Sequence, residues 1–329
     1  MRNNGSTTSA TMAVDDKVFS AVRLSRRHLI GAAAATTALA ATNRLAIAAD
    51  GKSDGYIDAH VHVWTPDTNK YPLDKAYDKS SMQPASFTPE QLMAHAKPAG
   101  VNRIVLIQMS FYGVDNSYML DVMAAHPGRF SGVAVIDPAD KPRQTMRQLK
   151  SQGVRGFRIV AGKQPADQWL DNPTMHKMWS IAADEGLAIC PLMNPEYLPA
   201  VDAMCAKYPK TRVVVDHFAR IGVDGKIQDA QVEALCRLAR HENAYLKASA
   251  FYALGKKQAP YTDLGPMIHR CMDAYGSQRM MWASDCPYQV EDGHTYQESI
   301  DLIREKLDFL SDQDRAWMLG KTAEKVFWS

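Results

Sequence analysis

Two histidines stand one residue apart in the segment YIDAHVHVW, residues 56–64. The rest of the segment is mostly apolar, as expected of a strand buried inside a sheet. Alternate residues of a strand point to the same side, so His60 and His62 are predicted to face one spot. Because a buried imidazole without a partner is costly, the pair indicates a site that binds something.

Further polar residues stand near the ends of the other apolar segments. They are Gln108 and Ser110, Arg155 and Arg158, Asn194, Asp216, His217 and Arg220, Lys247 and Ser249, and Ser284 and Asp285. His217 by itself has an equally good structural explanation, and Asp285 by itself could cap a helix. Taken with the histidine pair, both add ligands that suit Zn²⁺ or Mn²⁺ with one open position for water. The predicted metal set is His60, His62, His217 and Asp285.

Eight short apolar segments must position these residues. They span residues 56–64, 103–110, 130–137, 154–160, 187–193, 212–219, 244–250 and 279–287. Helix-like stretches separate them, and this alternation over about 280 residues predicts a single (β/α)₈ barrel covering residues 54–329. The alternative is an open doubly wound sheet, but HVHVWTP after the first segment lacks its glycine-rich fingerprint.

The helix signals between the segments are specific in places. Thr88, Pro89 and Gln91 predict a helix start with a capping box. Asn172 before Pro173 predicts a second start, and Gly186 marks its end. Residues 229–243 and 297–310 carry apolar positions at helical spacing.

The first 48 residues are interpreted as an export signal rather than as part of the barrel. Arg26 and Arg27 precede an alanine-rich run, and Ala46-Ile47-Ala48 supplies a cleavage site. The apolar run is too short to span a bilayer, so no stable membrane insertion is expected after cleavage. The pattern predicts a periplasmic protein, or a cytoplasmic one if the signal is not used. The five cysteines contain no CxxC pair and are predicted to be buried thiols.

Charge and composition limit the classes of partner that the chain is expected to bind. A formal net charge of +2, with no basic block, argues against nucleic-acid binding. A monomer or a small homo-oligomer is expected.

The segments YIDAHVHVW, VVVDHFAR and MMWASDCPYQ resemble the amidohydrolase superfamily, in its amidohydrolase-related branch, over the whole of residues 54–329. GVRGFRI and YLKASAFY are most similar to the lactonase subgroup, whose members open pyrone-dicarboxylate, sulfomuconolactone and sugar-acid lactone rings. Two departures bear on the metal. The fourth segment has arginines where many members carry a bridging lysine or glutamate, and CPLMNPE has no histidine in the fifth. The resemblance therefore implies one divalent ion, Zn²⁺ or Mn²⁺, or none.

What the resemblance implies is hydrolysis of a small anionic lactone, carboxylated or sulfonated, of the kind met in aromatic catabolism. Asp285 would take a proton from water and return it to the leaving oxygen. His60, His62 and His217 would polarise the ester carbonyl. Anionic groups would bind Arg155, Arg158 and Arg220, and the ring would be oriented by Gln108, Ser110, Asn194 and Tyr288.

Three alternatives stay open at this point. A sugar-acid lactonase would use the same site on a different ring. A metal-dependent decarboxylase of an unsaturated acid would release carbon dioxide, although the missing histidine of the fifth segment weighs against it. A periplasmic binding protein for a small acid would explain the arginines but not the histidines and Asp285.

Overall fold

A parallel barrel of eight strands forms the centre of the computed structural model, which describes residues 55–162 and 164–329. The predicted signal, residues 1–48, lies outside the described residues. Neighbouring strands pair in sequence order, so the predicted (β/α)₈ barrel is confirmed. The strands are β1 (Tyr56–Val61), β2 (Val101–Ile107), β3 (Phe130–Ala134), β4 (Val154–Val160), β5 (Ala188–Leu192), β6 (Arg212–Val215), β7 (Ala244–Ala248) and β8 (Met280–Trp282).

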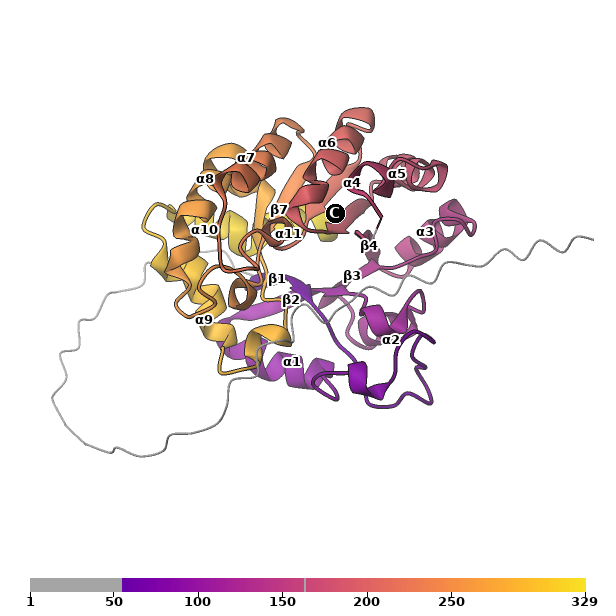
Figure 1. Cartoon of the computed structure of the whole chain (residues 1–329). Coiled ribbons are helices and arrows are strands. Elements are labelled where there is room, and N and C mark those ends of the chain that lie inside the picture. Colours follow the sequence, from indigo (N-terminus) through magenta and orange to yellow (C-terminus); the bar gives the residue numbers. More distant parts are fainter. Residues whose placement is uncertain (1–54, 163) are drawn as a thin grey trace, which may run out of the picture. The chain divides into compact units, whose positions relative to one another are not determined.

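Helices surround the strands, as Figure 1 shows. Thr88 and Asn172 cap their helices through side-chain oxygens, and Gly186 ends its helix in a left-handed conformation, as predicted. The helices are α1 (Pro89–Ala96), α2 (Ser117–Ala125), α3 (Pro142–Ser151), α4 (Ala166–Trp169), α5 (Pro173–Glu185), α6 (Leu198–Lys207), α7 (Asp229–Arg237), α8 (Gly265–Tyr275), α9 (Tyr296–Asp301), α10 (Asp312–Ala316) and α11 (Thr322–Phe327).

One predicted helix differs from the observed one. Residues 297–310 were expected to form a single helix, but α9 ends at Asp301 and a π-helical turn, Leu302–Lys306, follows it. The wider turn places the adjacent residues Leu302 and Ile303 both on the buried side. The apolar spacing therefore predicted burial correctly and the hydrogen-bond pattern incorrectly.

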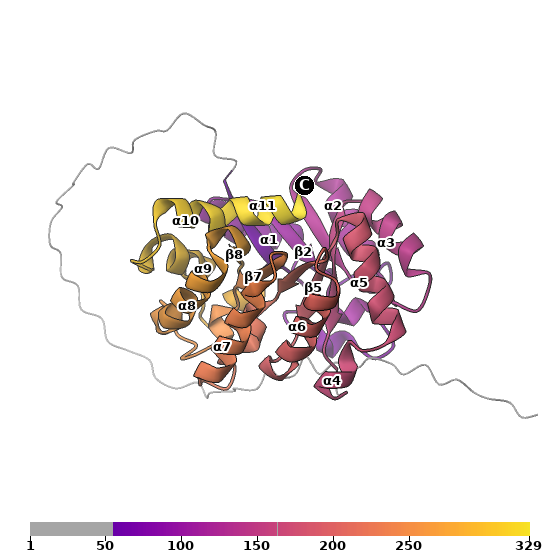
Figure 2. The ribbon, with the colours of Figure 1, turned by 90° about the horizontal axis from the view of Figure 1, so that it is seen from above.

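The amino-terminal end of the barrel is filled with apolar side chains. Tyr245, Met281 and Val214 from three strands pack in one buried cluster with Phe327 and Val326 of α11. In the view of Figure 2, turned by 90° from Figure 1, α11 lies across this end of the strands. A packed interior of this kind leaves the opposite end for chemistry.

The barrel closes between β1 and the segment after β8. The amide of Asp285 donates to the carbonyl of His60 at 2.9 Å, and the amide of His62 donates to the carbonyl of Cys286 at 2.8 Å. The amide of Ser284 donates to the buried carboxylate of Asp58 at 2.9 Å. Closure of the barrel therefore places Asp285 directly beside the histidine pair.

β1 contains a bulge at the point where the histidines begin. Asp58 pairs with Ile104 and Val61 pairs with Leu106, so β1 holds one more residue than β2 over this interval. Before the bulge, Ile57 and Ala59 face the barrel interior. After it, His60 and His62 face the interior. The bulge therefore changes the inward-facing residues of β1 from odd-numbered to even-numbered positions.

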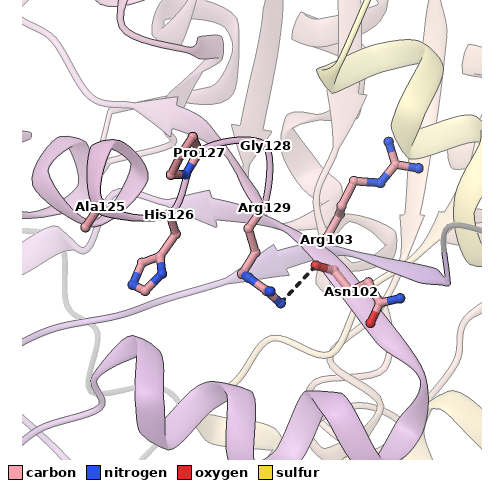
Figure 3. Close-up of a pocket in the computed structure, with 7 residues that line it drawn as sticks. All are labelled: Asn102, Arg103, Ala125, His126, Pro127, Gly128 and Arg129. Carbon is pink, nitrogen blue, oxygen red and sulfur yellow. Dashed lines mark hydrogen bonds between the residues drawn. The ribbon is translucent and has the colours of Figure 1, made fainter.

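A surface hollow of about 560 Å³ lies at the amino-terminal end of β2 and β3. Arg129 donates to the carbonyl of Asn102 there (Figure 3). The hollow is at the opposite end of the strands from the histidine pair, so it is separate from the candidate site. Among the described residues, no helix is long and apolar enough to cross a bilayer.

Candidate active site

The two histidines of β1 face each other across a short gap. His60 is fully buried, His62 is 4% exposed, and their Nε2 atoms lie 3.3 Å apart. The prediction that both face one spot is therefore confirmed.

Their hydrogen bonds decide which nitrogen carries the proton. His62 Nδ1 lies 2.9 Å from the carbonyl oxygen of Ile107, which can only accept, so Nδ1 holds the proton. His60 Nε2 lies 2.8 Å from Arg158 Nη2, which can only donate, so this nitrogen accepts; His60 Nδ1 lies 3.2 Å from Lys247 Nζ and 3.3 Å from Asp216 Oδ1. Nε2 of His62 therefore presents its lone pair to the gap, whereas the lone pair of His60 Nε2 accepts from Arg158.

His217 adds a third imidazole of the same kind. Its Nδ1 bonds to the hydroxyl of Ser249 at 2.8 Å, and Ser249 in turn donates to the carbonyl of Lys247. Nε2 of His217 is thus the acceptor atom, and it lies 3.8 Å from Asp285 Oδ1. His217 starts a left-handed turn in which four successive residues, none of them glycine, have positive φ. Such strained backbone persists where the surroundings hold it, often at functional sites.

Asp285 completes the cluster from the segment after β8. Its Oδ1 lies 3.5 Å from His60 Nε2 and 3.6 Å from His62 Nε2. Its Oδ2 accepts a hydrogen bond from the hydroxyl of Tyr252 at 2.7 Å. The side chain is almost fully buried, and its backbone is also left-handed, with φ of 67°.

Three buried charged residues, Asp216, Lys247 and Arg158, surround the imidazole of His60. Asp216 lies 3.0 Å from the Lys247 ammonium and 3.2 Å from the Arg158 guanidinium. Lys247 and Asp216 are fully buried, and Arg158 is 6% exposed. Buried charges of this kind persist only when they are paired, and this set fixes the imidazole of His60 from both sides.

The pKa values follow from this burial. Burial lowers the pKa of His217 to about 4, and burial together with the Lys247 ammonium holds the pKa of His60 well below its usual value. Burial alone would raise the pKa of Asp285, but the imidazoles of His217, His62 and His60 hold it well below its usual range. At neutral pH the site therefore contains a carboxylate beside the neutral imidazoles of His60 and His217.

The predicted catalytic residues come together, but not all predicted substrate contacts do. Arg155 is at the amino-terminal end of β4, where it donates to the carbonyls of Lys150 and Val154. The expectation that it binds substrate is corrected, because it lies three residues before Arg158 and on the opposite side of the strand. Arg158 lies inside the site.

Gln108 also faces away from the centre. Val105 and Ile107 of β2 face the barrel interior, so the even-numbered positions point outward. The side-chain amide of Gln108 donates to the carbonyl of Asp115 at 2.6 Å and holds the loop after β2. The role predicted for Gln108 in orienting substrate is thus replaced by a structural one. Ser110 starts the short helix after β2, Ser110–Tyr112, and is partly exposed.

Three predicted contacts remain near the carboxyl ends of the strands. Tyr288 is a ring neighbour of His62, with 6.1 Å between centroids. Asn194 follows β5, donates to Glu196, and has a buried Oδ1 without a hydrogen-bond partner among the described residues. Arg220 ends the left-handed turn that His217 starts and is half-buried.

Three contributors were absent from the predicted catalytic and binding sets. Asp216 and Lys247 stand at strand ends and were noted as polar there, but nothing in the sequence showed that they pair. Tyr252 follows β7 in the segment ASAFYALG and resembles any other loop aromatic. The one sequence feature that indicated a role for Tyr252 was its position just after the carboxyl end of a barrel strand.

The donor set fits a single metal ion. His60 Nε2, His62 Nε2 and Asp285 Oδ1 are separated by 3.3, 3.5 and 3.6 Å, with His217 Nε2 at 3.8 Å from the same oxygen. A tetrahedral ion with bonds of 2.0–2.2 Å requires ligand separations of about 3.3–3.6 Å. An ion bound here would take the lone pair of His60 Nε2, which in the structure accepts from Arg158 Nη2. Of the four predicted ligands, His60, His217 and Asp285 form the compact potential ligand group among the described residues, and His62 lies outside that group.

Comparison with known proteins shows what the chain is similar to in sequence and in fold. The amidohydrolase family model matches residues 57–328. An L-fucono-1,5-lactonase of Burkholderia ambifaria is 28% identical over 72% of this chain and 82% of its own length. A 4-sulfomuconolactone hydrolase of Rhizobium radiobacter is 25% identical over 71% of this chain and 76% of its own. A crystal structure of an amidohydrolase from Burkholderia multivorans with bound zinc has a TM-score of 0.70 at 20% identity, over 83% of this chain and 99% of the other.

Proposed function

The chain belongs to the amidohydrolase family, and from this premise we propose that it is a hydrolase that opens a small lactone ring by attack of water on the ester carbonyl. The observation that carries the proposal is the convergence of three imidazole Nε2 atoms, those of His60, His62 and His217, on the buried carboxylate of Asp285. Such a cluster can hold a water molecule and remove its proton, which is what ester hydrolysis requires.

Asp285 performs both proton transfers in this mechanism. Its carboxylate accepts a proton from water as the water oxygen bonds to the carbonyl carbon. The tetrahedral intermediate then collapses, the ring carbon–oxygen bond breaks, and the protonated Asp285 returns the proton to the leaving oxygen. The product is a hydroxy acid, or the keto form of an enol, and Asp285 is again a carboxylate.

His60, His62, His217 and Asp285 are the residues that would hold a divalent ion. A bound Zn²⁺ or Mn²⁺ would supply Lewis acidity to the carbonyl oxygen and lower the pKa of water. The Lys247 and Asp216 pair fixes the imidazole of His60, and Ser249 fixes that of His217, so these donors are already oriented.

An anionic substituent on the lactone is supported by Arg158. Its Nη2 is engaged by His60 and Asp216, whereas its Nε is buried and has no hydrogen-bond partner among the described residues. A carboxylate or sulfonate of the substrate can accept from it. The 4-sulfomuconolactone hydrolase among the relatives has a substrate of this class.

A sugar-acid lactone is the second candidate, and Asn194 favours it. The buried Oδ1 of Asn194 accepts no hydrogen bond among the described residues, and a hydroxyl of a sugar ring could donate to it. An L-fucono-1,5-lactonase is also among the relatives.

The test is proton release on addition of lactones in a pH-stat. L-fucono-1,5-lactone, 4-sulfomuconolactone and 2-pyrone-4,6-dicarboxylate are the probes, and at least one should open at a rate far above its spontaneous hydrolysis. Release of carbon dioxide would instead indicate a decarboxylase. Binding of a probe without acid release would indicate a binding protein and would contradict the proposal.

The metal is tested separately. Metal analysis of the purified protein, followed by chelation and re-addition of Zn²⁺ or Mn²⁺, should find about one ion per chain and an activity that is lost and restored. Full activity after removal of all metal would show that the imidazoles work without an ion.

We also propose that the protein is exported. The support is the Arg26-Arg27 pair with the Ala46-Ile47-Ala48 site. Fractionation of the native cell should find the shortened chain in the periplasm, and replacement of both arginines by lysine should retain the full-length chain inside. An unprocessed chain in the cytoplasm of the native cell would contradict export.

A further inference from the structure

The hydroxyl of Tyr252 makes the shortest contact to the carboxylate of Asp285. It donates to Oδ2 at 2.7 Å, from the short helix Phe251–Ala253 that follows β7. The other oxygen, Oδ1, lies 3.5–3.8 Å from the three imidazole Nε2 atoms. These contacts are longer than the Tyr252 hydrogen bond, so the imidazoles hold Oδ1 less firmly than the Tyr252 hydroxyl holds Oδ2.

The ring of Tyr252 is held on two sides. Tyr288 lies 6.4 Å from it between centroids, and His294 lies 6.2 Å from it. His294 is itself fixed, because its Nδ1 bonds to the Tyr261 hydroxyl at 2.8 Å. Two loops, one after β7 and one after β8, thus meet at Tyr252 and limit its movement.

Asp285 needs an external support for a physical reason. Its backbone has a left-handed φ of 67°, a conformation that a residue with a side chain adopts only when its surroundings hold it. Its amide is bonded to the carbonyl of His60, but that bond fixes the backbone and leaves the carboxylate free to rotate. A base that is rotated away from the attacking water loses most of its effect.

We propose that Tyr252 is a positioning residue for the hydrolytic reaction: its hydroxyl holds Oδ2 of Asp285 so that Oδ1 faces the imidazoles and the attacking water. The inference rests on the proposed lactone hydrolysis. It assigns Tyr252 no proton transfer and no contact with substrate.

The test replaces Tyr252 by phenylalanine, which keeps the ring and removes only the hydroxyl. With the best lactone of the panel as substrate, the Tyr252→Phe variant should lose about 10- to 100-fold in kcat and change KM by less than about threefold, because a hydrogen bond to a charged acceptor is lost while substrate contacts stay. Tyr275→Phe is the matched control. It removes another buried hydroxyl with a 2.7 Å bond, from α8 to the carbonyl of Leu235 on α7, and this bond involves no residue of the candidate site. The kcat of this control should stay within about twofold of the wild type.

A second measurement shows whether Tyr252 acts through Asp285. In an Asp285→Glu background, where the carboxylate is displaced by one methylene group, adding Tyr252→Phe should cost less than about threefold in kcat. A full loss in that background, an unchanged kcat of Tyr252→Phe, or a raised KM at constant kcat would each overturn the proposal.

Failure of this proposal and failure of the proposed function are distinguishable. If the wild type opens no lactone, the function is wrong, and the role of Tyr252 is then judged from crystal structures. The Asp285 carboxylate should rotate in the Tyr252→Phe variant relative to the wild type. An unmoved carboxylate would overturn the positioning role.

Discussion

The two ends of the barrel are built from the same strands, yet they contain opposite kinds of residues. At the amino-terminal end, Tyr245, Met281 and Phe327 pack in an apolar plug. At the carboxyl end, the same strands β7 and β8 lead to Lys247 and Asp285 among the imidazoles. β4 shows the contrast within three residues, since Arg155 binds backbone carbonyls at one end and Arg158 binds His60 and Asp216 at the other.

The loops at the two ends differ as well. Turns that lead into strands place glycine in the left-handed region, as at Gly153 before β4 and Gly186 before β5. Among the described residues, every left-handed residue that is not glycine lies in a loop that follows a strand, including His217, Ala250 and Asp285. Glycine makes a turn without strain, whereas a strained residue supplies a side chain at a required place. Residues that stabilise the fold are therefore concentrated at one end of the barrel, and residues that can do chemistry at the other.

The largest effect is expected from removing the base at the carboxyl end. Asp285→Asn should lower kcat on the best lactone by roughly 10³-fold, because the amide cannot accept the proton of water. The melting temperature should stay close to that of the wild type. The control is Asp312→Asn, a fully exposed carboxylate on α10, which should have no effect on kcat. Retention of activity in Asp285→Asn would remove the base from the mechanism.

At the amino-terminal end, we expect a substitution to reduce stability and to leave activity nearly unchanged. Phe327→Ala removes a side chain that is 1% exposed and fills the plug, so it should lower the free energy of unfolding by about 3–5 kcal/mol. Urea denaturation measures the loss, and kcat should remain within about threefold below the unfolding transition. A large drop in kcat in the folded protein would show that the two ends are not independent.

Asp58 tests how the buried polar groups near the site depend on pH. Burial raises its pKa to about 6, above the value of 3.8 for an exposed carboxyl. Between these values the folded chain holds a proton that the unfolded chain has lost. The stabilisation from this proton is therefore fully present below about pH 4 and is lost as the pH rises through 6.

Asp58→Asn removes this titration and keeps acceptor capacity for the amides of His60 and Ser284. Relative to the wild type, its free energy of unfolding should rise by about 3 kcal/mol between pH 4 and pH 7, as measured by urea denaturation at both values. A difference that does not vary with pH would show that the pKa of Asp58 is not raised.

The smallest effect is expected when the activities of variants at the two arginines of β4 are compared. Arg158→Gln should lower kcat/KM about 10- to 100-fold, because the charged partner of His60 and Asp216 is lost. Arg155→Gln should leave kcat/KM within about twofold and reduce stability by about 1 kcal/mol through the lost backbone contacts. Equal losses of activity in the two variants would contradict the assignment of Arg155 to the amino-terminal end.

Much of the fold was predictable because its signals are local. Continuous apolar segments mark buried parallel strands, and capping residues such as Thr88 and Asn172 mark helix starts. The predicted catalytic residues were found for a related reason. Imidazole and carboxylate groups at strand ends are conspicuous, and parallel strands of a barrel bring their carboxyl ends together.

The errors arose where the direction of a side chain decides its role. Gln108 and Arg155 stand on the right strands but point away from the centre or lie at its other end. Tyr252 was missed because the approach of the β7 loop to Asp285 depends on loop packing and not on any short pattern.

Local patterns along the chain are enough to predict the alternation of strands and helices and the presence of His60, His62, His217 and Asp285 at strand ends. The folded barrel is needed to know that a bulge in β1 places both histidines inside, that closure of β1 against the segment after β8 brings Asp285 beside them, and that Asp216 pairs with both Arg158 and Lys247. The physical reason is that periodicity is a property of neighbours along the chain. Charge pairing, lone-pair direction and side-chain support depend on residues that meet only after the barrel has closed.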